Sequence, residues 1–207
     1  MAFFMTNNLF SNNQYGFIKG RSTVLQLLKI IDQWTTNLET CKQIDIVYTD
    51  FEKAFDKVPH KRLLQKLKWY GLNEKIVRWV EAFLCYRTQK VKVNNSISNA
   101  NPVLSGIPQG SVLGPLLFIF INDLPVVWKN LCDTFFFADD GKLYECITND
   151  NDHVSVEMSC QNVFDWTETW CMKLNVIKRK VLTIAKNSAI RSVYHYEFKN
   201  SNDCVKL

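Results

Sequence analysis

The sequence predicts an α+β fold, in which strands and helices alternate along one continuous domain and at least two strands form an antiparallel hairpin. Three segments carry this prediction. Residues 23–38 have apolar side chains at the spacing of a helix, and residues 44–49 are mostly apolar and β-branched, as in a buried strand. Residues 134–144 have the pattern of a strand, a tight turn and a returning strand.

The first half of the chain contains three predicted helices. Ser22 or Thr23 is positioned to cap the first of them. The second begins after Pro59, buries three leucines and is ended by Gly71. Asn73 caps the third. The apolar side of this third helix consists of Ile76, Val77, Val80, Phe83 and Leu84.

The second half contains most of the predicted strands. A short strand and turn at residues 91–96 are followed by a loop rich in Gly and Pro, which leads into a buried apolar helix ending near Asp123. After the hairpin, a long helix is predicted over residues 153–172. Residues 181–185 and 194–198 are predicted as the last two strands.

The composition is that of an ordinary globular protein. Of 207 residues, 47% are hydrophobic and 22% are charged, which excludes disorder as the global state. The longest apolar run, residues 112–121, is about half the roughly 20 residues that a membrane span needs. No cationic flank precedes Lys19, so the N-terminus does not look like a signal peptide. We therefore expect an intracellular protein, in the nucleus or cytoplasm, with no membrane partner.

The cysteines add a prediction about redox state. Seven are scattered along the chain, and none forms a C-x-x-C pair. Their odd number and their spacing indicate a reducing compartment and argue against a disulfide framework or a zinc knuckle. The sequence leaves the oligomeric state open.

Charge is distributed in blocks. Residues 57–90 hold nine Lys or Arg against two Glu, and residues 173–191 hold six Lys or Arg and no acid. Residues 145–168 hold six acids and no base. Basic blocks of this kind suit a face that binds phosphates, but charge alone favours the interpretation as solvated helix surfaces.

Two carboxylate sites are the candidates for chemistry. Asp50 follows a predicted strand, and Asp139 and Asp140 lie at the turn of the predicted hairpin, 89 residues further along the chain. Adjacent carboxylates repel each other unless a cation lies between them, and hard oxygen ligands suit Mg²⁺. Two such ions can clamp the attacking and leaving oxygens of a phosphoryl transfer. An Asp-Asp pair is also common in ordinary solvated turns, so neither site is decisive alone.

The residues around these carboxylates form an ordered series of motifs. The motifs are YTDFEKAFD at 48–56, SGIPQGS at 105–111 and FADD at 137–140. They resemble, in order, motifs A, B and C of reverse transcriptases. Residues 14–23 and 166–178 resemble the segment before motif A and the later W…W…N-x-x-K segment of the enzymes of non-LTR (LINE-type) retrotransposons.

This resemblance implies a right-hand polymerase palm, an antiparallel sheet with packed helices, together with partial fingers and no thumb. Residues 1–44 would be partial fingers, and residues 45–207 the palm with an inserted helical segment. The implied activity is RNA-directed DNA synthesis with two Mg²⁺ ions, or Mn²⁺. The implied partners are an RNA template, a DNA primer and dNTPs.

The resemblance also assigns roles to single residues. Asp50, Asp139 and Asp140 match the catalytic, metal-binding triad. Phe55 matches the aromatic steric gate that leaves no room for a 2′-hydroxyl, although a plain core position is the alternative. The residues expected near the nucleotide are Phe51, Phe55, Gln109, Gly110, Lys178 and Arg21. For Lys178 a solvated turn, and for Arg21 a capping or surface role, remain the alternatives.

Three structural expectations complete the prediction. Asp123 caps a helix or pairs locally, and His60 and His195 lie at the surface. Gly141 stands where the enzymes that this chain resembles commonly carry a small polar residue, which we regard as a minor change.

Two other functions remain open. Because segments expected at both ends of the polymerase are missing, the chain can be an inactive remnant that at most binds nucleic acid. A metal-dependent nuclease also uses clustered carboxylates, but the P-Q-G loop and Phe55 have no evident role in it.

Overall fold

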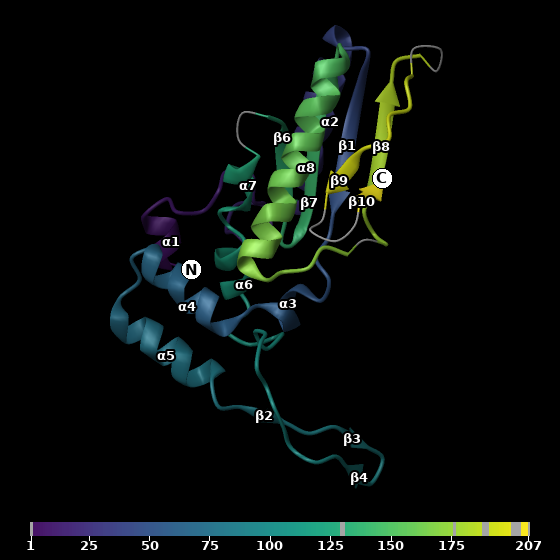
Figure 1. Cartoon of the computed structure of the whole chain (residues 1–207). Coiled ribbons are helices and arrows are strands. Elements are labelled where there is room, and N and C mark those ends of the chain that lie inside the picture. The colour runs from purple at the N-terminus through teal and green to yellow at the C-terminus, as the bar shows by residue number, and fades with distance from the viewer. Residues whose placement is uncertain (1, 129–130, 176, 188–190, 200–203, 207) are drawn as a thin grey trace.

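The computed structural model describes residues 2–128, 131–175, 177–187, 191–199 and 204–206. Its centre is a four-stranded antiparallel sheet with the strand order β6-β7-β1-β8 (Figure 1). These strands are β1 (Gln43–Thr49), β6 (Asp133–Phe137), β7 (Asp140–Ile147) and β8 (Lys180–Ala185). A separate C-terminal pair consists of β9 (Glu197–Lys199) and β10 (Cys204–Lys206). The predicted α+β class and the predicted hairpin are confirmed.

The central strand β1 is buried on both sides, as its apolar sequence predicts. Ile44 and Ile46 pack with Ile30 of α2 (Thr23–Thr40), whereas Val47 packs with Val156 of α8 (Asp150–Trp170). Because successive side chains of a strand point to opposite faces, α2 and α8 cover the two faces of the sheet.

A buried polar cluster lies on the α8 side of the sheet. Asp45 of β1 is 1% exposed and accepts hydrogen bonds from the hydroxyl of Tyr196 and from the amide of Gln43. Nδ1 of His153, in α8, lies 2.9 Å from that hydroxyl and 3.5 Å from the Asp45 carboxylate. These partners compensate the burial of Asp45 and attach the segment after β8 to the sheet.

Below the sheet, short helices surround the largest core cluster. They are α1 (Ala2–Thr6), α3 (Ala54–Lys57), α4 (His60–Trp69), α5 (Glu74–Leu84), α6 (Leu116–Phe120) and α7 (Leu124–Val127). The predicted caps Ser22 and Asn73 each accept a backbone N–H of the helix that follows. The apolar helix predicted to end near Asp123 ends earlier, at Phe120 of α6, and turn residues 121–123 separate it from α7.

Lys66 ties three of these helices together. Its ammonium donates to the carbonyl of Phe120 at 2.6 Å and pairs with Asp123 at 2.5 Å, and it lies 3.8 Å from the ring centroid of Trp170. Burial lowers the pKa of Lys66 to about 8, against the opposing attraction of Asp123. Asp123 therefore does pair, but with a lysine that lies 57 residues away in the sequence.

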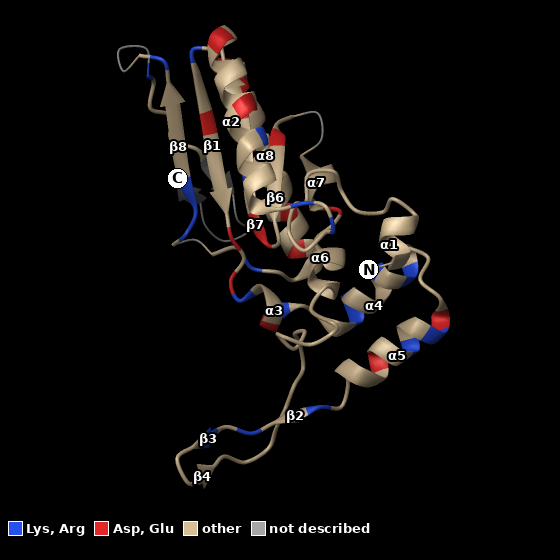
Figure 2. Cartoon of the chain, turned by 180° about the vertical axis from the view of Figure 1, so that it is seen from behind, with Lys and Arg blue, Asp and Glu red and all other residues tan. Residues whose placement is uncertain are grey.

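An arm projects from the helical end (Figures 1 and 2). It consists of β2 (Thr88–Gln89) paired with β5 (Asn101–Pro102), and β3 (Lys92–Val93) paired with β4 (Ser96–Ile97). Every residue of the arm from 88 to 102 is exposed, and the segment contains lysines but no acid. Figure 2 accordingly shows blue segments along the arm and none in red.

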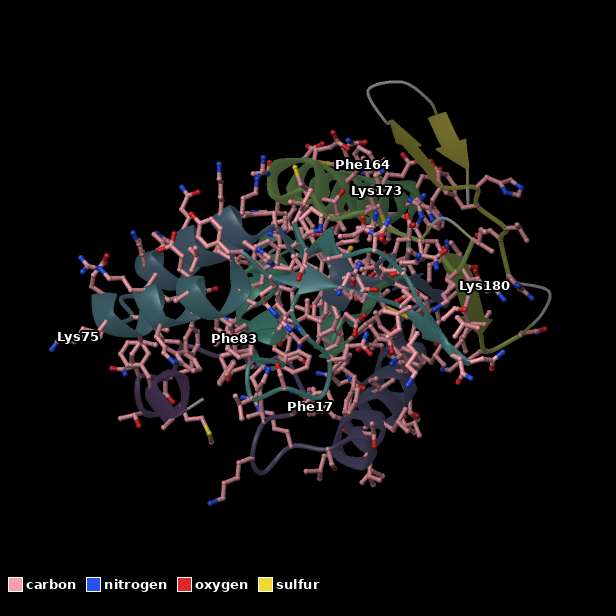
Figure 3. All side chains as sticks on the ribbon, turned by 90° about the horizontal axis from the view of Figure 1, so that it is seen from below. Phe17, Lys75, Phe83, Phe164, Lys173 and Lys180 are labelled. Atoms are coloured by element: carbon pink, nitrogen blue, oxygen red, sulfur yellow. A yellow bond between two sulfur atoms is a disulfide. The ribbon has the colours of Figure 1, made fainter. Side chains whose placement is uncertain are left out.

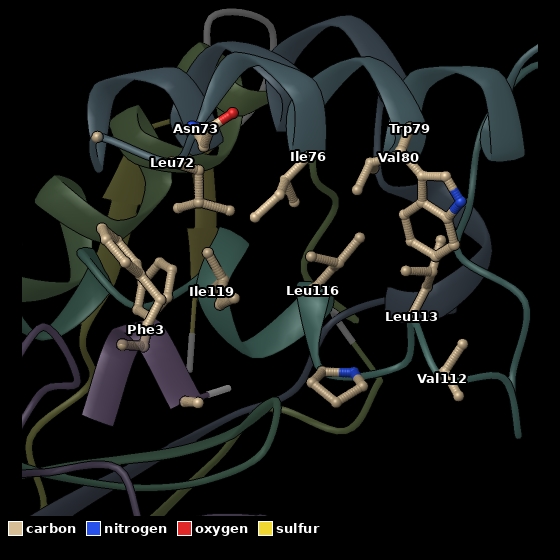
Figure 4. A pocket seen from close by; sticks show the side chains of 14 residues that line it. Phe3, Leu72, Asn73, Ile76, Trp79, Val80, Val112, Leu113, Leu116 and Ile119 are labelled. Carbon is tan, nitrogen blue, oxygen red and sulfur yellow. The ribbon is translucent and has the colours of Figure 1, made fainter. Parts of the chain in front are cut away.

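Several predicted apolar faces are more exposed than expected. Ile76 of α5 is 50% exposed, and with Trp79 and Val112 it lines an apolar pocket of about 590 Å³ between α1, α5 and α6 (Figure 4). On α2, the buried side is formed by Gln26 and Ile30. The other apolar residues of the first half of α2 are exposed, namely Val24, Leu25, Leu27, Leu28 and Ile31. Figure 3 shows Lys75, which precedes Ile76 in the sequence, projecting outward at the N-terminal end of α5.

The prediction from the cysteines was wrong for one pair. Cys41, at the end of α2, and Cys146, in β7, form a disulfide with a Cα–Cα distance of 5.7 Å. The two residues are 105 apart in the sequence, and their pairing follows from the packing of α2 on the sheet. Within the described part of the chain, no helix is long and apolar enough to cross a membrane.

We expect Lys66→Ala to lower the free energy of unfolding by about 3 kcal/mol, because it leaves the partly buried Asp123 carboxylate without its partner. Urea unfolding followed by circular dichroism measures the change. Lys68→Ala is the matched control, since Lys68 lies on the same helix in an exposed pair with Glu74 and its loss costs about 0.5 kcal/mol or less. Equal losses in the two variants would contradict the role given to Lys66.

Candidate active site

The first carboxylate, Asp50, lies where β1 ends. The chain beyond β1 is held by the segment that precedes β8. Phe51 forms a β-bridge with Leu174, and the N–H of Asn175 donates to the carbonyl of Asp50 at 2.8 Å. The Asp50 side chain is 15% exposed. These backbone contacts hold Asp50 at this edge of the sheet without the help of a ligand.

The other two carboxylates lie at the turn between β6 and β7. Phe137 pairs with Asp140, so Ala138 and Asp139 form a two-residue loop, in which Ala138 has a φ of +57°. In the antiparallel pairing of β1 with β7, Thr49 lies opposite Gly141. The next position in this register places Asp50 beside Asp140. The fold therefore brings the three predicted carboxylates to the same edge.

Gly141 has no room for a side chain. A Cβ there would collide with Oγ1 of Thr49 and would lie 2.9 Å from a ring carbon of Phe136. Glycine at this position therefore leaves room for the hydroxyl of Thr49 and the ring of Phe136. A larger residue at Gly141 would have to displace the Thr49 hydroxyl or the Phe136 ring, a constraint that the expectation of a minor change did not include.

The electrostatics reflect the crowding of like charges. Burial raises the pKa of Asp139, and the nearby charges of Asp140 and Asp50 raise it further. The pKa of Asp140 is raised by burial and then by Asp50. The opposing influence at both residues includes the positive charge of Lys178. These carboxylates therefore lie in a site where added positive charge is favourable.

Lys178 supplies part of that charge. Its ammonium lies 2.8 Å from Oδ2 of Asp50, and this interaction raises the pKa of Lys178. Asn175 forms the turn that leads to Lys178, because its Oδ1 accepts the N–H groups of Ile177 and Lys178 at 3.2 and 3.3 Å. The resemblance pointed to the lysine, whereas the role of the asparagine became visible only in the structure.

A cavity of about 330 Å³ opens at this edge. It is lined by Tyr48, Thr49, Asp50, Asp140, Gly141, Lys142 and Lys178. Apart from the ion pair with Lys178, Oδ2 of Asp50 is buried and accepts no hydrogen bond from the described residues. Among those residues, no group of three His, Cys, Asp or Glu side chains converges closely enough to hold a metal ion. The carboxylates thus share an edge without meeting at one point.

The aromatic residues of motif A separate into two environments. Phe51 is 3% exposed and packs against Trp166, so its side chain belongs to the core. Phe55 is half-buried and meets the ring of Phe118 edge-on. Phe118 in turn stacks on Phe17, with centroids 4.7 Å apart.

The P-Q-G loop lies at a second cavity. Gln109 and Gly110 are exposed, and Gln109 lines a cavity of about 780 Å³ together with Lys53, Lys57 and Arg87. His60 is buried and lies 2.8 Å from the carbonyl of Gly106 through Nε2, so the expectation of a surface histidine was wrong. The sequence around His60 does not indicate this contact, because Gly106 lies 46 residues further along the chain.

Two of the predicted phosphate-binding cations have structural roles. Nη1 of Arg21 donates to the carbonyls of Ser11 and Gln14 and so holds the turn between them. Lys66, counted in the basic block 57–90, is buried in its ion pair with Asp123. The exposed remainder of the block, which includes Lys57, Lys61 and Arg87, is available to an external partner.

Comparisons with known proteins identify the family of this chain. The family described as "Reverse transcriptase (RNA-dependent DNA polymerase)" matches residues 2–201. Among curated relatives, the chain is 28% identical over 183 residues to the probable RNA-directed DNA polymerase from transposon BS of Drosophila melanogaster. It is 29% identical over 186 residues to the RNA-directed DNA polymerase from mobile element jockey of the same species. These matches cover 79% and 84% of this chain but only 19% and 20% of the relatives, so the chain spans about a fifth of their length.

Solved structures agree in fold. A telomerase structure from Candida tropicalis matches 85% of this chain and 37% of its own, with a TM-score of 0.62 and 12% identity. Telomerase from Candida albicans, in complex with a TWJ fragment of telomeric RNA, matches 87% of this chain and 33% of its own, with a TM-score of 0.59 and 14% identity. The polymerase fold and the likeness to non-LTR retrotransposon enzymes are thereby confirmed. The chain belongs to the reverse transcriptase (RNA-dependent DNA polymerase) family.

Proposed function

We propose that the chain is the polymerase domain of a non-LTR retrotransposon reverse transcriptase, which adds dNTPs to a primer 3′-hydroxyl on an RNA template. The observation that carries this proposal is that the β1–β7 pairing brings Asp50, Asp139 and Asp140 to one edge of the sheet. Carboxylates with raised pKa values, crowded beside a cavity, are typical of sites that bind cations and phosphates. Members of this family generally use divalent metal ions.

Asp50, Asp139 and Asp140 would hold Mg²⁺ or Mn²⁺. Their fit rests on oxygen donors of like charge and on a buried Asp50 oxygen with no hydrogen bond beyond its ion pair. When bound, the ions supply charge neutralisation at the α-phosphate and at the departing pyrophosphate. Lys178 is exposed apart from its ion pair with Asp50, so its ammonium is free to turn toward a triphosphate when cations replace it.

Phe55 would select the sugar. Its ring is braced by Phe118 and lies on a short helix that begins four residues after Asp50, so it sits next to the carboxylate edge along the chain. A fixed ring below the ribose excludes a 2′-hydroxyl by contact. Gln109 and Gly110, exposed on the P-Q-G loop, would lie against the nucleotide or the template strand.

Nucleic acid would be held mainly through its phosphates. The cavity beside the P-Q-G loop carries Lys53, Lys57 and Arg87 against a single acid, Asp56. Such contacts give binding that depends on salt but not on sequence. One telomerase structure similar in fold holds an RNA fragment, which supports an RNA template here. The division into partial fingers at 1–44 and palm at 45–207 stays a prediction.

We expect Asp139→Asn to reduce primer extension by about 10³-fold or more, because the substitution removes a charge from the proposed metal site. The same change relieves repulsion between neighbouring carboxylates, so the melting temperature should stay equal or rise. Extension of a labelled DNA primer on an RNA template with Mg²⁺ and dNTPs measures the first effect, and thermal unfolding the second. Asp165→Asn, on the exposed side of α8, is the matched control.

Extension that survives in Asp139→Asn would refute the metal role of this carboxylate. If the unaltered chain binds primer–template in a salt-dependent manner but does not extend it, even at high Mg²⁺ and dNTP, the non-catalytic alternative holds. Cleavage of a labelled duplex without dNTPs would indicate a nuclease instead.

We further expect Phe55→Ala to weaken the discrimination between dNTPs and rNTPs by at least about tenfold, which corresponds to about 1.4 kcal/mol in the transition state. The ratio of kcat/KM for dTTP and UTP in primer extension measures this. Phe83→Ala, which truncates a partly exposed ring on α5, should leave the ratio unchanged. A Phe55→Ala enzyme that discriminates as well as the unaltered chain would assign Phe55 to the core alone.

A further inference from the structure

The turn that carries Asp139 and Asp140 is reached by a segment from the start of the chain. Residues 13–15 run beside β6. The N–H of Phe136 donates to the carbonyl of Asn13, and the N–H of Tyr15 donates to the carbonyl of Phe136, each at 2.8 Å. Gln14 lies between these bonds in a parallel bridge with Phe136. Its side chain is therefore directed along the hairpin toward the turn.

The amide of Gln14 makes three hydrogen bonds at that turn. Its Oε1 accepts the N–H groups of Ala138 at 2.9 Å and of Gly16 at 2.8 Å, and its Nε2 donates to the carbonyl of Ala138 at 2.9 Å. Gln14 is 3% exposed, so water does not compete for these bonds. One side chain thus holds both backbone groups of the residue that precedes Asp139.

Ala138 needs such support. It adopts a φ of +57°, a left-handed conformation that residues with a Cβ disfavour. Gly16 lets the N-terminal segment approach this turn closely, because a Cβ there would collide with the backbone nitrogen of Ala138. The left-handed turn sets the direction in which the next residue, Asp139, leaves the hairpin. The repulsion among the three carboxylates acts against this arrangement.

We propose that Gln14 is a positioning residue, whose amide holds the Ala138 turn so that Asp139 and Asp140 bind the divalent cation. This inference rests on the proposed function, because it assumes that the two carboxylates are metal ligands. Gln14 does not touch the cation or the nucleotide; it acts only through the backbone of Ala138. The alternative is a purely structural tie between the N-terminal segment and β6.

A neighbouring hydrogen bond makes it possible to distinguish the positioning role of Gln14 from a purely structural one. Nδ2 of Asn13 donates to Oγ1 of Thr134 at 2.7 Å, and so joins the same segment to the same strand, away from the turn. Loss of either tie weakens the attachment of the segment. Only loss of the Gln14 amide frees the turn itself.

The experiment measures Mn²⁺ binding by the full chain, from the electron paramagnetic resonance signal of free Mn²⁺, together with thermal unfolding. Gln14→Met keeps the length of the side chain and removes all three hydrogen bonds. We expect its dissociation constant for Mn²⁺ to rise at least tenfold, while Asn13→Ala binds within about twofold of the unaltered chain. Gln14→Asn, which keeps an amide but is one methylene too short, should also weaken binding and serves if Gln14→Met does not fold.

The unaltered chain and Asp139→Asn distinguish a failure of the proposed metal site from a failure of the proposed role of Gln14. Mn²⁺ binding that is present in the unaltered chain and lost in Asp139→Asn supports the proposed metal site, however the Gln14 variants behave. If folded Gln14→Met or Gln14→Asn then binds Mn²⁺ as tightly as the unaltered chain, Gln14 is not a positioning residue. If Asn13→Ala weakens binding as much as the Gln14 variants, the segment acts only as a structural tie. If the unaltered chain binds no Mn²⁺, the proposed metal site fails first.

Discussion

The antiparallel register between β1 and β7 is the constraint on which the rest of the site depends. It places Thr49 opposite Gly141 and so brings Asp50 next to Asp140, although the two residues are far apart in the sequence. A slip of one residue would turn every side chain of β1 to the other face and separate the carboxylates. Gly141 fits this register because its lack of a side chain leaves room for the hydroxyl of Thr49, which lies opposite it. The burial of β1 between α2 and α8 then holds the strand in place.

The same constraint creates an electrostatic cost that the chain offsets locally. Burial, together with the crowding of three carboxylates at one edge, raises the pKa values of Asp139 and Asp140, which is unfavourable for folding at neutral pH. Lys178, positioned by the turn at Asn175, offsets part of this repulsion without a metal ion. A site that is strained in this way when empty gains more from binding cations than a relaxed one would. The crowded carboxylates therefore lower the stability of the fold at this edge and raise its affinity for positive charge.

The sequence predicts the local elements of this fold better than their partners. The caps, the strand at 44–49 and the hairpin follow from short-range patterns, and the structure confirms them. The turn itself lies earlier than predicted, at Ala138 and Asp139, because Asp140 and Gly141 already pair within β7. The contacts of Lys66 and His60 were missed because each partner lies far along the chain. The disulfide of Cys41 and Cys146 was missed for the same reason. The exposure of Ile76 was missed because periodicity identifies an apolar face but not what covers it.

The candidate site follows a similar division. The three carboxylates could be named from their motifs, and the sheet brings them together. The motifs could not show that Phe51 belongs to the core or that Arg21 is used by carbonyls of its own segment. They also could not show that the carboxylates share an edge without converging, because this depends on side-chain positions and on the competing ammonium of Lys178.

A crystal structure of the chain grown with Mn²⁺, with its anomalous difference map, tests the central claim most directly. The account predicts a peak bound jointly by Asp50 and by Asp139 or Asp140, with the Lys178 ammonium displaced from Asp50. A map with no peak at this edge at saturating Mn²⁺, and with the Lys178–Asp50 pair intact, would contradict it.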